Sequence, residues 1–268
     1  MKNSLLFAVL FSLLAFSSST YAQFGEPAVQ KKDNPRSLFN EGYTTGFGIS
    51  LNLSDFGFGA GAQFRKGIRP YNEALITFKI ASLKDPSEQT FVNYSFGFRT
   101  IPNKYQRAIS FPLYFGLKKR FFAKDIADNF RVFSTLSAGP VFTISYPYFS
   151  DVNNNGFREN DRFVYGFEER VNDIFSGFNE SETHWGIGGE TAIGIDFGEN
   201  FSNLSTIQFG FTMNYYNNGI QILEPQKPVF DNGVPQYNDL GELIMEEANA
   251  PRKYFGSAQI TFVFGWMW

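Results

Sequence analysis

The sequence predicts an all-β fold, an antiparallel up-and-down transmembrane β-barrel of roughly eight to ten strands. Three observations predict it: apolar residues alternate with small or polar ones after residue 42, several alternating stretches have ten or more residues, and aromatic residues gather toward their ends. Alternation indicates strands. A tilted membrane-crossing strand needs about 9–11 residues, whereas strands of soluble proteins average about five or six. Aromatic residues at strand ends fit girdles at the two lipid–water interfaces.

The chain begins with the layout of a secretory signal peptide. Lys2 precedes an apolar run from Leu5 to Phe16, and a tail of small residues ends at Ala22. This order predicts export and cleavage after Ala22, with a buried N-terminal helix as the alternative. We therefore expect a signal peptide over 1–22, a tail or plug over 23–42 and the barrel over 43–268.

Composition narrows the classes of function. The net charge is −3 and no basic cluster is present, which argues against a nucleic-acid partner. Cysteine is absent, so an exported chain must be stable without disulfides. Aromatic residues make up 19% of the chain and glycines number 25, which suits strands that are apolar on one face only.

Nine stretches carry the alternation: 43–53, 56–65, 73–82, 90–99, 108–119, 130–146, 184–197, 205–216 and 253–268. A single-chain barrel of this kind uses an even number of strands. Either one stretch is a loop hairpin or plug, or a strand is missing, in which case 36–43 or 161–171 supplies it. Pro112 lacks an N–H donor, and the sequence predicts a β-bulge there.

Charged residues occupy the polar parity of these stretches: Arg65, Lys79, Arg99, Lys118, Arg131, Glu190 and Asp196. This face meets water in a soluble sandwich or barrel and points inward in a membrane barrel. Enclosed charges would pair with one another, and a barrel of this size has no room for a diffusion channel.

The connections are unequal in length. Residues 147–183 and 217–252 are long and polar, whereas the segments "NLSD" and "DFGENFSN" are tight. We expect the long ones to be external loops and both tight ones to be turns at the opposite, periplasmic end.

The C-terminal stretch carries one apolar parity to the last residue of the sequence: Ile260, Phe262, Phe264, Trp266 and Trp268. The last strand of a barrel pairs with the first and turns one face to lipid. This ending resembles the C-terminal signature of bacterial outer-membrane β-barrel proteins. The stretches "ISFPLYFGLKKRFF" and "DNFRVFSTLSAGP" also look like paired strands of small barrels of the OmpA/OmpX type.

The resemblance implies a location in the outer membrane and contact with its lipid. It also implies recognition of the last strand by the barrel-assembly machinery. The signal would be the five alternating residues Ile260, Phe262, Phe264, Trp266 and Trp268. The resemblance implies no enzymatic activity.

The segment "DVNNNGFRENDRF" is a candidate calcium loop over 151–162. Alternate positions offer ligands in the order of a D-x-[DN]-x-[DN]-G loop: Asp151, Asn153, Asn155, Phe157 through its carbonyl, and Glu159. Arg162 stands where a bidentate glutamate is expected, and Asp161 could replace it only with a different geometry. The alternative is an external loop that is rich in Asn and Gly because of turn chemistry alone.

His184 is the single histidine, so any histidine-dependent catalysis would use it. Some outer-membrane lipid-modifying enzymes use a His–Ser pair with a carboxylate. Ser181 is close in sequence, but no feature marks it as a nucleophile. A strand-end histidine without a catalytic role is the simpler interpretation.

These observations favour a non-enzymatic outer-membrane barrel with a structural or surface-interaction role through its two long loops. No cofactor is expected except calcium in 151–162, and the sequence identifies no extracellular partner. Two alternatives stay open. One is a barrel enzyme that modifies lipid or lipopolysaccharide through His184, and the other is a secreted soluble β-barrel or sandwich that binds an apolar ligand inside.

Overall fold

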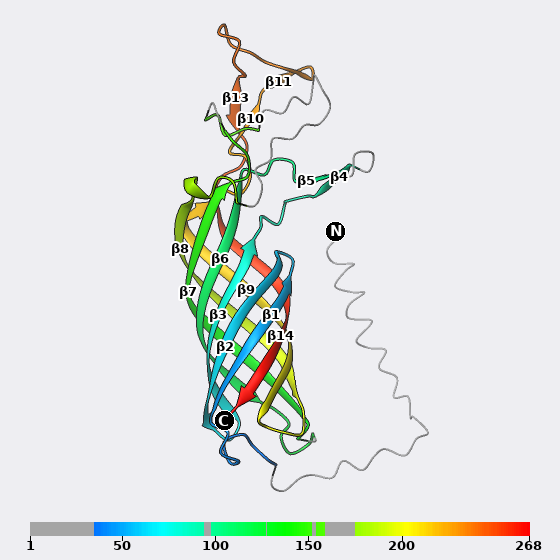
Figure 1. The fold of residues 1–268 in the computed structure, drawn as a ribbon. Helices are drawn as coiled ribbons and strands as arrows, with labels where there is room; N and C mark the ends of the chain where they lie inside the picture. Colours follow the sequence, from blue (N-terminus) through cyan, green and yellow to red (C-terminus); the bar gives the residue numbers. More distant parts are fainter. Residues whose placement is uncertain (1–34, 94–97, 127, 152–153, 159–174) are drawn as a thin grey trace, which may run out of the picture. The chain divides into compact units, whose positions relative to one another are not determined.

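The computed structural model describes residues 35–93, 98–126, 128–151, 154–158 and 175–268. Eight long strands close into one antiparallel barrel (Figure 1). They are β1 (Thr45–Ser54), β2 (Gly57–Arg69), β3 (Asn72–Leu83), β6 (Gln106–Arg120), β7 (Phe130–Pro147), β8 (Glu182–Phe197), β9 (Asn203–Ile220) and β14 (Arg252–Met267). Each pairs with the next of the eight, as an up-and-down barrel requires.

Short elements occupy the connections. They are the hairpin of β4 (Phe91–Asn93) with β5 (Phe98–Thr100), the 3₁₀ turn η1 (Phe178–Glu180), and the pairs β10 (Gln226–Pro228) with β13 (Met245–Glu247) and β11 (Phe230–Asp231) with β12 (Val234–Pro235). No helix long and apolar enough to cross a bilayer occurs in the described part of the chain.

Eight of the nine predicted strands are barrel strands. The prediction for 90–99 is wrong, because this stretch folds back on itself as the β4–β5 hairpin and pairs with no barrel strand. Arg99 is therefore on a loop hairpin and not on a wall of the barrel. Residues 36–43 form turns and no strand, whereas 161–171 and the predicted signal peptide, 1–22, lie outside the described residues.

Backbone pairing of the first and last strands closes the barrel. The register runs without interruption from Gly46 opposite Met267 to Ser54 opposite Gln259. Beyond it, the carbonyl of Trp268 accepts hydrogen bonds from the N–H groups of Thr44 (3.1 Å) and Thr45 (3.0 Å). The apolar ending of the sequence is therefore part of the wall, as a closed sheet demands.

The connections divide into two sets. The turns at 70–71, 121–129 and 198–202 lie at one end of the barrel, called the turn end. At the other, the loop end, lie the three long connections (84–105, 148–181 and 221–251) and the turn at Asp55 and Phe56. The placement of "NLSD" opposite the long loops is therefore wrong. One false strand between it and the C-terminus reversed its end, whereas "DFGENFSN" lies where predicted.

The predicted bulge at Pro112 is also wrong. Phe78 lies opposite Leu113 and Ala81 opposite Ser110, so the register between β3 and β6 is the same on both sides of the proline. The ladder loses pairs there without an inserted residue. Irregular pairing occurs instead between Gly67 and Arg69 on β2 and between Arg252 and Tyr254 on β14.

Candidate functional site

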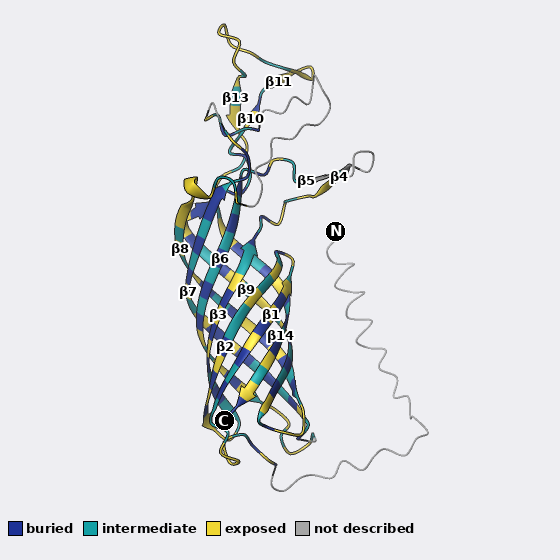
Figure 2. Ribbon diagram, viewed as in Figure 1, coloured by how far each residue is buried: buried dark blue, intermediate teal, exposed yellow. Residues whose placement is uncertain are grey.

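The outward positions of the barrel carry large apolar side chains that protein does not cover, among them Ile49, Leu51, Phe78, Leu117, Leu136, Ile187, Ile193, Phe209 and Phe264. Leu136, near the middle of β7, is 70% exposed. Figure 2 shows exposed residues alternating with buried ones along the strands. In water such a surface would be an aggregation hazard.

The inward positions carry the charges. Seven ionisable residues inside the barrel are buried: Arg65, Glu73, Lys79, Lys118, Arg131, Glu190 and Asp196. Apolar side chains outside and charges inside are the reverse of a soluble protein and the arrangement of a barrel in lipid. This is a transmembrane β-barrel.

Aromatic side chains at the strand ends support this assignment. The rings of Tyr215 and Tyr254 lie in tilted contact, 4.9 Å between centroids, at the loop end of β9 and β14. Phe47 and Trp266 lie 6.0 Å apart near the turn end. Such residues mark the two interfaces of a bilayer.

The lumen near the turn end is filled by an ionic network. Asp196 forms ion pairs with Lys118 and with Arg65 (3.2 Å) and accepts a hydrogen bond from Thr206 (2.5 Å). Lys118 also lies 3.6 Å from Glu73. A buried carboxylate is tolerated only where such partners compensate for lost hydration.

A second ion pair joins Lys79 on β3 to Glu190 on β8. Because these strands are not neighbours, the side chains meet across the lumen. The sequence placed seven charges inside, of which Arg99 is on the β4–β5 hairpin instead. Of the six on barrel strands, five pair with a partner of opposite charge, as expected. The sixth, Arg131, donates to the carbonyls of Asp128 and Gly198, both at 2.8 Å.

The lumen near the loop end is apolar instead. A buried cluster fills it: Phe56, Leu83, Ala108, Tyr114, Val141, Tyr216, Ile220, Ile222 and Phe255. The tyrosine hydroxyls are satisfied inside it: Tyr114 donates to Asn214 (2.6 Å), and Tyr216 pairs with Thr143 (2.6 Å). The lumen is therefore occupied by two different groups of side chains along the barrel axis: ionic ones toward the turn end and mostly apolar ones toward the loop end.

Residues 35–44 pack at the turn end. The guanidinium of Arg36 lies 4.7 Å from the centre of the Phe201 ring. The backbone carbonyl of Arg36 accepts a hydrogen bond from the Arg120 side chain (2.8 Å). Ser37 is buried. The described part of the predicted tail or plug thus contacts the barrel.

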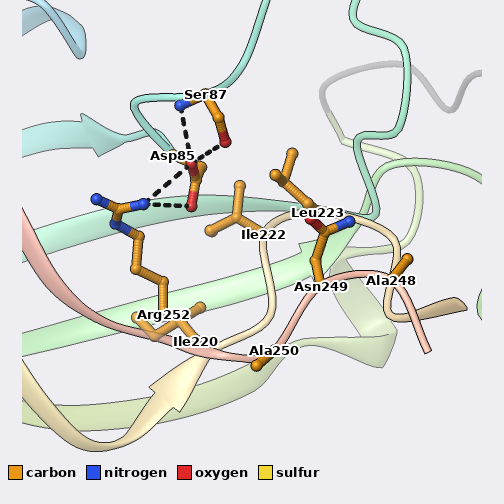
Figure 3. A pocket seen from close by; sticks show the side chains of 9 residues that line it. All are labelled: Asp85, Ser87, Ile220, Ile222, Leu223, Ala248, Asn249, Ala250 and Arg252. Atoms are coloured by element: carbon orange, nitrogen blue, oxygen red, sulfur yellow. Dashed lines mark hydrogen bonds and ion pairs between the residues drawn. The ribbon is translucent and has the colours of Figure 1, made fainter.

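A pocket of about 270 Å³ lies at the loop end (Figure 3). Its lining includes the apolar residues Ile220, Ile222 and Leu223 and the charged residues Asp85 and Arg252. Two 3.3 Å contacts join the Arg252 guanidinium to the Asp85 carboxylate, which also accepts a hydrogen bond from the N–H of Ser87 (2.9 Å). These two charges neutralise each other, so the pocket has no net charge that would favour an anion or a cation.

The Asp85–Arg252 ion pair also joins β14 to the segment after β3, beyond the end of the shorter β1–β2 hairpin that separates these strands in the sheet. β1 ends at Ser54, opposite Gln259, so residues 252–258 of β14 have no pairing partner in β1. The N–H of Asp55 donates to Ser257 Oγ (3.2 Å), which holds the short hairpin against β14.

The candidate calcium loop is only partly described, because Asn153 and Glu159 lie outside the described residues. The carboxylate of Asp151 accepts hydrogen bonds from the N–H groups of Asn155 (3.2 Å) and Gly156 (2.8 Å). Phe157 N–H donates to the Asn155 side chain (2.9 Å). Two of the side chains that the sequence proposed as ligands, those of Asp151 and Asn155, therefore close a turn. Calcium in 151–162 stays a prediction, and the described residues contain no cluster of acidic or histidine ligands.

His184 lies beside a serine, but not the one that the sequence suggested. Its Nε2 is 2.8 Å from the hydroxyl of Ser145 on β7, and Glu182 approaches the same nitrogen at 4.0 Å. In a catalytic triad the carboxylate holds the other ring nitrogen. Ser145 is fully buried, so its hydroxyl is covered by other groups of the protein. The contact fits a hydrogen bond inside the wall better than a nucleophile and its base.

Sequence reasoning missed several participants in the lumen. Glu73 shares the parity of Lys79 on the same strand and could have been found from it. Gln63, which accepts a hydrogen bond from Arg65 at 2.7 Å, likewise shares that arginine's parity. Tyr114 has an inward parity too, but no sequence signal places its hydroxyl beside Asn214.

The five residues of the predicted assembly signal stand on the outward parity of β14 and at its end, and three of them are well exposed: Phe264, Trp266 and Trp268. They are accessible from the lipid side. Recognition by the assembly machinery stays a prediction.

The chain is similar to three solved structures of small outer-membrane proteins, each at 10% sequence identity. Neisserial surface protein A (NspA) has a TM-score of 0.34, with 84% of this chain and 95% of that chain covered. OprG from Pseudomonas aeruginosa has a TM-score of 0.33, with 84% and 94% covered. Ail, the attachment invasion locus protein of Yersinia pestis, has a TM-score of 0.32, with 83% and 94% covered. No family model matches the chain, and no curated protein matches it.

Proposed function

We propose that the protein is an integral outer-membrane barrel that does not conduct solutes and acts through the loops at its loop end, in a structural or surface-interaction role. The observation that carries this proposal is the doubly filled lumen. An ionic network and an apolar cluster leave the loops as the part of the molecule available to partners. Barrels of eight strands generally have interiors that side chains fill.

The location is tested by cell fractionation followed by a heat-modifiability gel. We expect the protein in the outer-membrane fraction, with a shift in migration on boiling. Protease added to intact cells should cut within 221–251, which places the loop end outside. Recovery as a soluble periplasmic protein would contradict the proposal.

Conduction is tested with the purified barrel in a planar bilayer. We expect no steady channels in salt solution, because ion pairs such as Lys79–Glu190 cross the lumen. A stable single-channel current would overturn the closed lumen and leave the membrane location intact.

The alternative of an enzyme retains one supporting contact, between Ser145 and His184. It predicts that His184→Ala and Ser145→Ala abolish a change in lipid or lipopolysaccharide composition while the barrel stays folded. An unchanged lipid profile after deletion of the gene would count against it. The alternative of a soluble barrel needs an apolar interior throughout and a polar exterior, and the barrel has neither.

A further inference from the structure

The connection between β9 and β14 forms an arm, residues 225–250, that is held together by its own backbone. β10 pairs with β13, and β11 pairs with β12. Further hydrogen bonds join the two sides of the arm, including Val229 N–H to the carbonyl of Ile244 (2.8 Å) and Ala248 N–H to that of Pro225 (2.8 Å). The arm is therefore an ordered element whose polar backbone is largely satisfied.

Large apolar side chains on this arm are left uncovered: Phe230, Val234, Tyr237, Leu240 and Ile244. Leu240 is 83% exposed, more than any outward leucine of the barrel. Figure 2 shows exposed residues over much of the arm. Lipid covers the outward residues of the barrel, but the arm belongs to a connection beyond the strand ends. Ordered apolar surface that neither protein nor lipid covers marks an interaction site.

The charge of the arm selects the kind of partner. One lysine, Lys227, stands against five carboxylates, a net charge of −4: Asp231, Asp239, Glu242, Glu246 and Glu247. Three of these already have a side-chain partner: Glu246 pairs with Lys227 (3.1 Å), Glu242 accepts from the Asn238 side chain (2.9 Å), and Asp231 accepts from the Asn232 side chain (3.2 Å). Asp239 and Glu247 are exposed.

We propose that this arm binds a positively charged polypeptide segment that carries apolar side chains of its own. This inference rests on the proposed function, because it requires the arm to face the outside of the cell. Complementary charge speeds association, and apolar contact supplies most of the affinity. A second copy of the arm would bring the same −4 charge, and a lipid surface that carries phosphates would be repelled as well.

The experiment uses the full barrel in nanodiscs of phosphatidylcholine, with empty discs as the reference. The probe is a short synthetic peptide of alternating lysine and leucine, and the control peptide has glutamate in place of lysine. Binding is followed by calorimetry at low and high salt. We expect the lysine peptide to bind above the empty-disc level, the glutamate peptide not to, and salt to weaken the binding.

Variants separate the two contributions. Asp239→Asn with Glu247→Gln removes two charges without removing a hydrogen bond and should weaken binding and reduce its salt dependence. Leu240→Ser should weaken it by about tenfold, the loss expected when a leucine side chain is only partly buried by a partner. Glu180→Gln, an exposed carboxylate at the same end of the barrel, is the matched control and should bind like the unchanged protein.

Three results would overturn the inference: no binding above empty discs, equal binding of both peptides, or equal binding by the arm variants. Sedimentation that shows dimers dependent on Leu240 would also overturn it, because the occupant would then be a second copy. Each variant must keep the heat-modifiable shift. If the barrel is at the surface and the peptide does not bind, only this inference fails. Recovery of the protein in the soluble fraction would instead contradict the proposed function.

Discussion

Lys118 on β6 and Asp196 on β8 form an ion pair across the interior, past the strand that separates them in the sheet. The contact is possible because the lumen is narrow and the intervening strand, β7, contributes a flat surface there, the ring of Phe133, 4.1 Å from the Lys118 ammonium. Arg65 approaches the same carboxylate from β2. One acidic side chain thus holds cations from two other strands.

Replacement of Asp196 by Asn should therefore destabilise the barrel strongly. The change keeps the shape of the side chain but leaves Arg65 buried without its anion and Lys118 with only the more distant Glu73 (3.6 Å). Loss of one partner of a buried pair costs about 3–5 kcal/mol. The urea midpoint of unfolding in lipid vesicles measures the loss. Glu199→Gln, an exposed carboxylate in the following turn, is the control, and equal midpoints for both variants would show that the network contributes little.

The alternation of the strands allowed most of this interior to be predicted. Parity placed Arg65, Lys79, Lys118, Glu190 and Asp196 on one face, since every second side chain of a strand shares a face. Strand length, aromatic placement and unequal connections then predicted that this face points inward. Partner choice could not be predicted, because it depends on the register and tilt of strands that are distant in sequence. Asp196 and Arg65 meet only after the barrel closes.

Strand number was the weaker part of the sequence prediction. The stretch 90–99 alternates like a membrane strand, yet its two halves pair with each other. Local pattern cannot distinguish one long strand from a short hairpin when the turn between the halves lacks a strong signal. That single error also moved "NLSD" to the wrong end.

The lipid-facing assignment predicts a contrast between two exposed leucines. Leu136→Arg should destabilise the barrel by about 2–4 kcal/mol, because its side chain faces the middle of the bilayer. Leu240→Arg should leave the unfolding midpoint unchanged, since the arm is outside the lipid. Both variants would be compared in the same vesicles. Similar effects at the two positions would contradict the placement of the wall in lipid.

The C-terminal residue predicts a difference between cells and vesicles. Trp268→Ala keeps the backbone hydrogen bonds to Thr44 and Thr45, so the purified protein should refold into vesicles with little loss of stability. In cells, the amount assembled in the outer membrane should fall severalfold if the assembly machinery reads this side chain. Trp185→Ala, at the opposite end of the barrel, is the comparison. Equal amounts of both variants in the outer membrane would contradict the hypothesis that Trp268 is part of the assembly signal.

The hydrogen bonds of Asp151 predict that its replacement will open the loop that follows β7. Asp151→Ala removes the acceptor for two backbone N–H groups, which should cost about 1–3 kcal/mol locally and speed protease cleavage within 147–183. The same digestion tests calcium. If the ion binds at 151–162, calcium should slow cleavage of the unchanged protein and a chelator should restore it. If neither calcium nor the chelator changes the cleavage rate, the ion does not bind there and hydrogen bonds alone close the turn.

The seam between β1 and β14 has a consequence for biogenesis. Gly46 pairs with Met267, which is far from it in the sequence, so contacts of very high sequence separation must form before the edges of β1 and β14 are protected. Until β14 is in place, the barrel is open, and a fragment that lacks β14 would be prone to aggregate because its apolar outward side chains have no lipid around them. Premature termination anywhere upstream of β14 would therefore leave β1 without its partner and the barrel unclosed.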